Sequence, residues 1–196
     1  MKKIITISRE FGSGGRTVGR MVAEKLGIPF YDKEIIEKAA EETGFTESFI
    51  SEHGEHSAYK NIFAYSFIGR TFDGMSADDY IWSIQRKIIR DLAEKGPCVI
   101  VGRCADYILQ DRDDCLHAFI HADIASRAKR IVEKYGETSD SPEKRLADKD
   151  KKRRNNYKYY TDREWGMSQN YDISLDSSTL GLERCADIIV ELAKIL

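Results

Sequence analysis

The chain has 196 residues and a formal net charge of −2 at pH 7, with 31 basic side chains nearly balanced by 33 acidic ones. This length suits one domain with a substantial core, so we expect a single domain over residues 1–196. The charge balance excludes a strong overall attraction to nucleic acid or to a membrane surface, and we expect neither as a partner. The apolar run before Arg9 is too short for a signal peptide or a membrane-spanning helix, which favours a cytoplasmic protein.

The first predicted elements are a strand, a glycine-rich turn and a helix within residues 4–26. The β-branched run at residues 4–7 is typical of a buried parallel strand, and apolar residues at helical spacing from Val18 to Leu26 indicate an amphipathic helix. Between them lie three glycines that allow positive φ and let backbone N–H groups converge on an anion: Gly12, Gly14 and Gly15. This order predicts a phosphate-binding loop; the alternative is a glycine-rich turn that binds nothing.

The P-loop pattern G-x-x-x-x-G-K-[ST] aligns with residues 10–17 but is altered at two of its fixed positions. Glu10 replaces the first glycine, and Arg16 replaces the lysine. Thr17 matches the hydroxyl that binds magnesium. Because arginine keeps the positive charge and offers a planar fork of donors to phosphate oxygens, we predict that this loop still binds phosphate.

Four further strands are predicted at residues 28–32, 98–102, 117–121 and 171–176. Helices are expected at residues 33–42, 46–53, 77–95, 124–135 and 182–195. Residues 57–79 mix aromatic residues with glycines and show no clear period, so these aromatics either stack on a base or pack a helical subdomain. Five strands that alternate with helices predict an α/β fold in which helices cover both faces of a parallel sheet.

Asp32 and Arg103 lie at the carboxyl ends of predicted strands. Ligands of open α/β sheets bind at this edge, so we expect both side chains to face a ligand. Capping of the following helix is an equally acceptable and compatible role for Asp32. Asp106 follows Arg103 closely, where it either joins the same site or serves as an acid in the first turn of a helix.

A run of alternating charges at residues 148–154 precedes a segment rich in asparagine and tyrosine. Such a run is often a solvated helix face, and the tyrosines would also suit contact with nucleic acid. A third interpretation is a mobile basic segment that closes over a phosphoryl group in transfer and stabilises its charge. We favour this lid hypothesis because a phosphate-binding loop is predicted upstream.

Five segments, taken in order, resemble the cytidylate kinase-like family, a branch of the P-loop nucleoside monophosphate kinases. They are residues 8–17, 30–32, 99–106, 150–153, and 171–176 with the helix that follows. The resemblance spans nearly the whole chain and implies a P-loop NTPase three-layer fold with a five-stranded parallel sheet. It also implies a helical insertion that binds the acceptor nucleotide, over about residues 33–95, and a basic lid over about residues 137–168.

The same resemblance implies a role for individual residues. ATP would be bound by Gly12, Ser13, Gly14, Gly15, Arg16 and Thr17. Mg²⁺ would accompany the ATP and bind at Thr17. Asp32, Arg103 and Asp106 would face the acceptor nucleotide, while Arg153 and Arg154 would be catalytic together with the arginine of the loop. The implied reaction transfers the ATP γ-phosphoryl group to CMP or dCMP, in a monomer or homodimer. A P-loop kinase of another small molecule and a nucleotide-binding regulatory protein with little turnover are the alternatives.

Overall fold

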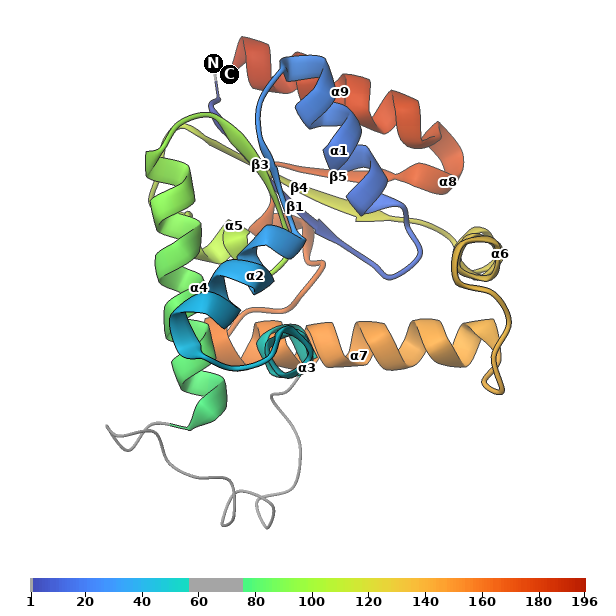
Figure 1. The fold of residues 1–196 in the computed structure, drawn as a ribbon. Coiled ribbons are helices and arrows are strands. Elements are labelled where there is room, and N and C mark those ends of the chain that lie inside the picture. The colour runs from blue at the N-terminus through green and yellow to red at the C-terminus, as the bar shows by residue number, and fades with distance from the viewer. Residues whose placement is uncertain (1, 57–75) are drawn as a thin grey trace.

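A computed structural model describes residues 2–56 and 76–196, and Figure 1 shows its fold. Within these residues, five parallel strands form one sheet in the order β2-β3-β1-β4-β5. The strands are β1 (Ile4–Arg9), β2 (Phe30–Tyr31), β3 (Cys98–Val101), β4 (Cys115–His121) and β5 (Ile173–Asp176). The predicted α/β fold with a five-stranded parallel sheet is therefore confirmed. Strand β4 begins earlier than expected because Cys115 and Leu116 pair with the start of β1.

The helices of the described residues lie on both faces of this sheet. They are α1 (Gly15–Leu26), α2 (Lys33–Thr43), α3 (Glu47–His56), α4 (Ala77–Glu94), α5 (Ala105–Ile108), α6 (Ile124–Tyr135), α7 (Pro142–Thr161), α8 (Ser177–Leu180) and α9 (Leu182–Ile195), with a 3-10 turn at Ser168–Asn170. Helices α1 and α9 cover one face, whereas α2, α4 and α5 cover the other (Figure 1). The aromatic-rich stretch at residues 57–75 lies outside the described residues.

The central strands are buried on both faces, as their continuous apolar runs predict. In β1, Ile5 and Ile7 pack into the core under α1 and α9, while Ile4 faces the core under α4. Strand β3 alternates in the same way, with Val99 in the first core and Ile100 in the second. All five side chains are at most 1% exposed, and burial of each contributes about 1.5–3 kcal/mol. These two cores fix the carboxyl ends of β1 and β3 side by side.

Local signals set the ends of several helices. Asp123 caps α6 by accepting a hydrogen bond from the Ser126 N–H at 2.7 Å, a role for which aspartate is favoured. Gly27 ends α1 in the left-handed conformation, with φ of 65°, which glycine adopts without a steric penalty. Helix α3 extends beyond the predicted end at residue 53.

The basic run that the sequence assigns to a lid lies within α7, a helix of 20 residues. Its buried side chains include Leu146, Asp150, Asn156 and Tyr157, and the helix packs against α6 and α3 (Figure 1). The segment is therefore ordered by contacts with the rest of the domain. None of the helices in the described ranges has the length and apolar character that a bilayer crossing requires.

Candidate active site

The turn between β1 and α1 has the backbone of an anion-binding loop. Gly12 and Gly14 have φ of 79° and 83°, and Gly14 is the N-cap of α1. No side chain caps this helix end, and its first turn carries no acid, so its N–H groups can bind an anion. Gly15 is helical, and it is needed for close packing, because a Cβ there would lie 2.5 Å from the Cβ of Arg9.

Asp32 connects the arginine of the loop with the arginine at the end of β3. The Asp32 Oδ2 lies 2.6 Å from Nε of Arg16, and its Oδ1 lies 3.3 Å from Nη1 of Arg103. The side chains of Asp32 and Arg103 are 9% and 4% exposed, whereas that of Arg16 is 37% exposed. Arg16 is thus exposed enough for a phosphate to approach its guanidinium. The structure thus brings together three residues that the sequence singled out.

Backbone strain accompanies the placement of Arg103. Both Arg103 and Cys104 have φ of 53°, in the left-handed region that non-glycine residues rarely occupy and that costs about 1–3 kcal/mol per residue. The Gly102 N–H donates to the Ile7 carbonyl at 3.0 Å, which holds the end of β3 on β1. The strained turn directs the Arg103 guanidinium to Asp32, and such strain is typical of functional sites.

A cavity of about 220 Å³ opens in front of the loop. Its charged lining consists of seven basic residues, Arg9, Arg16, Lys33, Arg103, Arg130, Lys134 and Arg153, and two acidic ones, Glu10 and Asp32. The excess of positive charge in a partly enclosed space attracts and stabilises a polyanion. Gly12 and Gly15 line the same cavity, so the loop backbone and the basic side chains face one ligand site.

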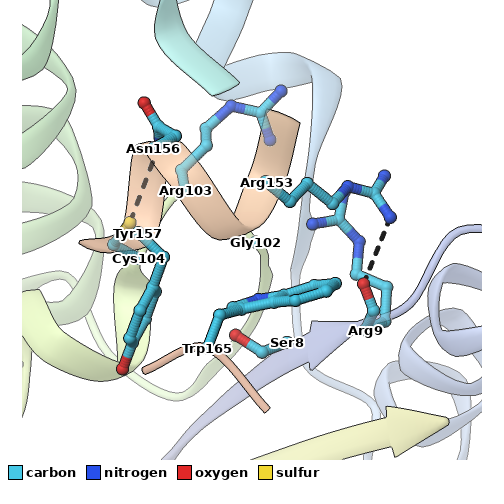
Figure 2. Close-up of a pocket in the computed structure, with 9 residues that line it drawn as sticks. All are labelled: Ser8, Arg9, Gly102, Arg103, Cys104, Arg153, Asn156, Tyr157 and Trp165. Atoms are coloured by element: carbon cyan, nitrogen blue, oxygen red, sulfur yellow. Dashed lines mark hydrogen bonds between the residues drawn. The ribbon is translucent and has the colours of Figure 1, made fainter. Parts of the chain in front are cut away.

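A smaller pocket of about 20 Å³ lies behind this cavity and shares Arg9, Arg103 and Arg153 with it (Figure 2). Figure 2 shows Arg153 extending from α7 toward Arg9, with the indole ring of Trp165 across the pocket from Asn156. The volume suffices for one water molecule or one small polar group. The cavity in front of the loop therefore has a polar extension toward α7.

Asp106 lies outside the lining of both pockets. The residue is 3% exposed, and its carboxylate accepts hydrogen bonds from the Ser8 hydroxyl at 3.1 Å and from the Tyr157 hydroxyl at 2.7 Å. Burial raises the pKa of the Asp106 carboxyl above its usual value. In this structure the side chain connects β1 with α7 and does not join Asp32 and Arg103.

Of the remaining predicted site residues, some line the cavity and others shape the loop beside it. Arg153 lines the cavity, whereas its neighbour Arg154 is exposed on α7 and does not. The Ser13 hydroxyl donates to the Glu10 carbonyl at 3.0 Å, and the Ser13 carbonyl accepts from the Ser177 hydroxyl at 2.6 Å. Ser13 thus shapes the loop through local bonds.

Sequence reasoning missed the basic residues that α6 contributes. Arg130 and Lys134 line the cavity, and Nη1 of Arg130 donates to the Gly12 carbonyl at 2.6 Å. Arg127 is 5% exposed and contacts the same loop. The spacing of these three residues along one helical face was a signal that could have identified them.

Mg²⁺ usually binds through one or two protein oxygens and completes its coordination with substrate phosphates and water. Side-chain oxygens in and beside the loop are those of Glu10, Ser13, Thr17 and Asp32. Glu10 and Asp32 line the cavity and are paired with arginines, whereas Thr17 lies in the first turn of α1. The described residues contain no cluster of three or more His, Cys, Asp or Glu side chains suited to a metal. This donor set fits a metal ion that arrives with a phosphorylated ligand.

Comparison with known proteins agrees with this geometry. Residues 4–179 match the family model described as the cytidylate kinase-like family. The cytidylate kinase of Archaeoglobus fulgidus is 28% identical over 197 aligned residues, which cover 97% of this chain and 94% of that protein.

Two solved structures extend the comparison. An uncharacterized protein from Eubacterium ventriosum has a TM-score of 0.73 and 29% identity, with 97% of this chain and 98% of that chain covered. Shikimate kinase from Acinetobacter baumannii, in complex with shikimate, has a TM-score of 0.58 and 16% identity, with 100% of this chain and 94% of that chain covered. The second likeness shows the shared fold alone.

Proposed function

This chain belongs to the cytidylate kinase-like family and is an ATP-dependent phosphotransferase; we propose that it transfers the γ-phosphoryl group of ATP to CMP or dCMP. The preference for a cytidine nucleotide is supported by the family and by the archaeal relative named cytidylate kinase. The other possible acceptors, a different nucleoside monophosphate or a small alcohol, are outcomes of the experiment described below.

The observation that carries the proposal is the excess of basic side chains around one cavity, seven against two carboxylates. A triphosphate donor and a monophosphate acceptor together bring more negative charge than a triphosphate and an alcohol, even one such as shikimate that carries a single carboxylate. Arg16 and Arg103 contact opposite oxygens of the Asp32 carboxylate. Two phosphates held by these arginines would therefore lie next to each other, which supports direct transfer between them.

In the proposed mechanism the loop residues, Gly12 to Thr17, bind the donor phosphates through backbone N–H groups and through Arg16. Mg²⁺ would be held by Thr17 and would neutralise charge on the phosphate oxygens. Arg103 orients the acceptor, and Asp32 holds Arg103 and Arg16 in place. The acceptor phosphate is already a nucleophile, so no strong base is needed and positioning supplies the rate enhancement.

Arg153 has the role of stabilising the charge that spreads over the transferred group. It lines both pockets, and α7 holds it against the Arg9 carbonyl at 3.1 Å. A preorganised cation of this kind typically contributes a factor of about 10²–10³ to kcat. Arg154, which is exposed on the same helix, would contribute less unless α7 changes its position when substrates bind.

The test is an ADP-release assay with ATP and Mg²⁺ and a panel of acceptors: CMP, dCMP, UMP, AMP, GMP and the non-nucleotide alcohol shikimate. We expect CMP or dCMP to stimulate ADP release the most. The critical variant is Arg103→Gln, which removes a buried charge in the cavity, and its matched control is Arg90→Gln, an exposed position on α4. Arg103→Gln should raise the KM for CMP while the dissociation constant for ATP stays unchanged.

A clear preference for shikimate or another alcohol would show that the acceptor is an alcohol and not CMP, while leaving the phosphotransferase assignment intact. ATP binding without stimulation by any acceptor in the panel would contradict the proposed function. A loss of CMP stimulation in Arg90→Gln equal to that in Arg103→Gln would remove the special role assigned to the cavity.

A further inference from the structure

Glu10, which replaces the first glycine of the P-loop pattern, has a defined role in the structure. Its Oε2 accepts a hydrogen bond from the Ala122 N–H at 3.2 Å and lies 3.1 Å from Nη1 of Arg127. Ala122 follows β4, and Arg127 lies in the first turns of α6. The carboxylate therefore joins the start of the phosphate loop to the end of β4 and to α6.

Arg127 uses each of its guanidinium nitrogens in this connection. Besides the contact with Glu10, its Nε donates to the Phe11 carbonyl at 2.8 Å, and its Nη2 is paired with Asp150 of α7. The other oxygen of Asp150 accepts from the Phe11 N–H at 2.8 Å. Arg127 and Asp150 are 5% and 6% exposed, and charges buried to this degree require close partners.

Helix α7 also presents Arg153, one turn after Asp150, to the loop. Its Nη1 donates to the Arg9 carbonyl at 3.1 Å, and its guanidinium lies 5.7 Å from the centre of the Phe11 ring (Figure 2 shows the contact with Arg9). The peptide groups of Arg9 and Phe11 are thus held by α6 and α7. Asp150 and Arg153 thus both attach α7 to the loop.

We propose that Glu10, Arg127 and Asp150 form a clamp that fixes the phosphate loop and Arg153 relative to each other, so that α6, α7 and the loop act as one unit. The three residues are positioning residues, because they act on transfer through Phe11 and Arg153. The inference rests on the proposed phosphotransfer. It also explains why the first position of the P-loop pattern is glutamate, because the carboxylate of Glu10 supplies one of the hydrogen-bond acceptors that Arg127 needs.

The first test measures kcat, the two KM values and the dissociation constant of ATP for Asp150→Asn. The matched control is Asp140→Asn, which removes an exposed carboxylate that pairs with Lys144 beside the start of α7. We expect Asp150→Asn to lower kcat by about 10²-fold, the size of effect that a misplacement of about 1 Å produces, with a smaller loss of ATP affinity. Asp140→Asn should behave as the parent.

Because removal of one partner of a buried ion pair can unfold a protein, a second variant keeps the clamp testable. The double variant Arg127→Met/Asp150→Asn removes both buried charges with little change in volume, so we expect it to fold with a melting temperature near that of the parent. Its kcat should nevertheless stay as low as that of Asp150→Asn. A kcat within about twofold of the parent, in a folded variant of either kind, would overturn the clamp.

Hydrogen exchange separates this inference from the proposed function. If the parent shows no transfer to any acceptor, the proposed function fails, but the clamp still predicts that Asp150→Asn accelerates amide exchange both in α7 and at residues 10–12. Acceleration confined to α7, with the loop amides unchanged, would show that the loop does not depend on Asp150. That result would refute the clamp even in an active kinase.

Discussion

Arg16 offers the most direct test of the site, because it stands where the P-loop pattern has lysine and yet is paired with Asp32 at 2.6 Å. Arg16→Ala removes a preorganised donor to the transferred phosphoryl group, a loss that typically lowers kcat by about 10²–10³-fold. It also leaves the Asp32 carboxylate with Arg103 as its partner, at 3.3 Å. A carboxylate and a phosphate about 4 Å apart repel each other by about 4 kcal/mol at the effective dielectric of a partly exposed site, for unit charges. We therefore expect a loss of kcat near the upper end of this range.

The same reasoning predicts how two further variants behave in the ADP-release assay with saturating ATP and CMP. Arg16→Lys retains a positive charge next to Asp32 but loses the planar fork, so it should keep far more activity than Arg16→Ala. In the Arg16→Ala background, Asp32→Asn removes the repulsion. Because Arg103 already neutralises part of the Asp32 charge, the recovery should be smaller than the full repulsion between unit charges, about tenfold in kcat or about 1.4 kcal/mol. The dissociation constant of ATP, measured by titration calorimetry, should follow the same order.

Two results would refute this account. A kcat of Arg16→Ala close to that of the parent would show that Arg16 does not stabilise the transferred group. A double variant no more active than Arg16→Ala would show that Asp32 does not oppose the incoming phosphate, even if Arg16 matters.

Two further predictions concern the loop and the buried carboxyl behind it. Gly12→Ala should destabilise the protein by about 1–3 kcal/mol and weaken ATP binding, since the new Cβ would lie 2.9 Å from the Arg127 carbonyl oxygen. The control is Gly44→Ala, which is also at positive φ but has nothing within 4 Å of its Cβ position. It should lower the free energy of unfolding in urea by less and leave ATP binding unchanged. Equal losses in the two variants would argue against a special fit at Gly12. The raised pKa of Asp106 means that the folded state retains a proton that the unfolded chain has lost, so the free energy of unfolding should fall as pH rises above the ordinary carboxyl pKa. Asp106→Asn should flatten that fall, and parallel pH profiles of the two proteins would contradict the assigned cause.

The elements whose signals are local could be predicted from the sequence. The β-branched run, the glycines and the helical spacing that follows are all contained within residues 4–26, and the structure has β1, the turn and α1 in that order. Asp32 and Arg103 could be assigned to the ligand edge because parallel strands present their carboxyl ends on the same side of a sheet. Asp106 is at the same edge, but the hydroxyls of Ser8 and Tyr157 hold its side chain in the interior. A residue's position along a strand predicts its edge and does not predict where its side chain points.

What the sequence by itself determined was the order of the strands and helices along the chain, the glycine-rich turn before α1 and the basic character of the segment now seen as α7, because each of these depends on neighbours a few residues apart. Only the tertiary structure decided that Glu10 and Asp150 meet at Arg127 and that Arg16 and Arg103 share Asp32. The physical reason is the separation of the partners: Phe11 and Asp150 are 139 positions apart, and Asp32 and Arg103 are 71 apart. Hydrophobic periodicity carries no information about such pairs, which meet because the parallel sheet brings its strand ends, and the helices that follow them, to one edge.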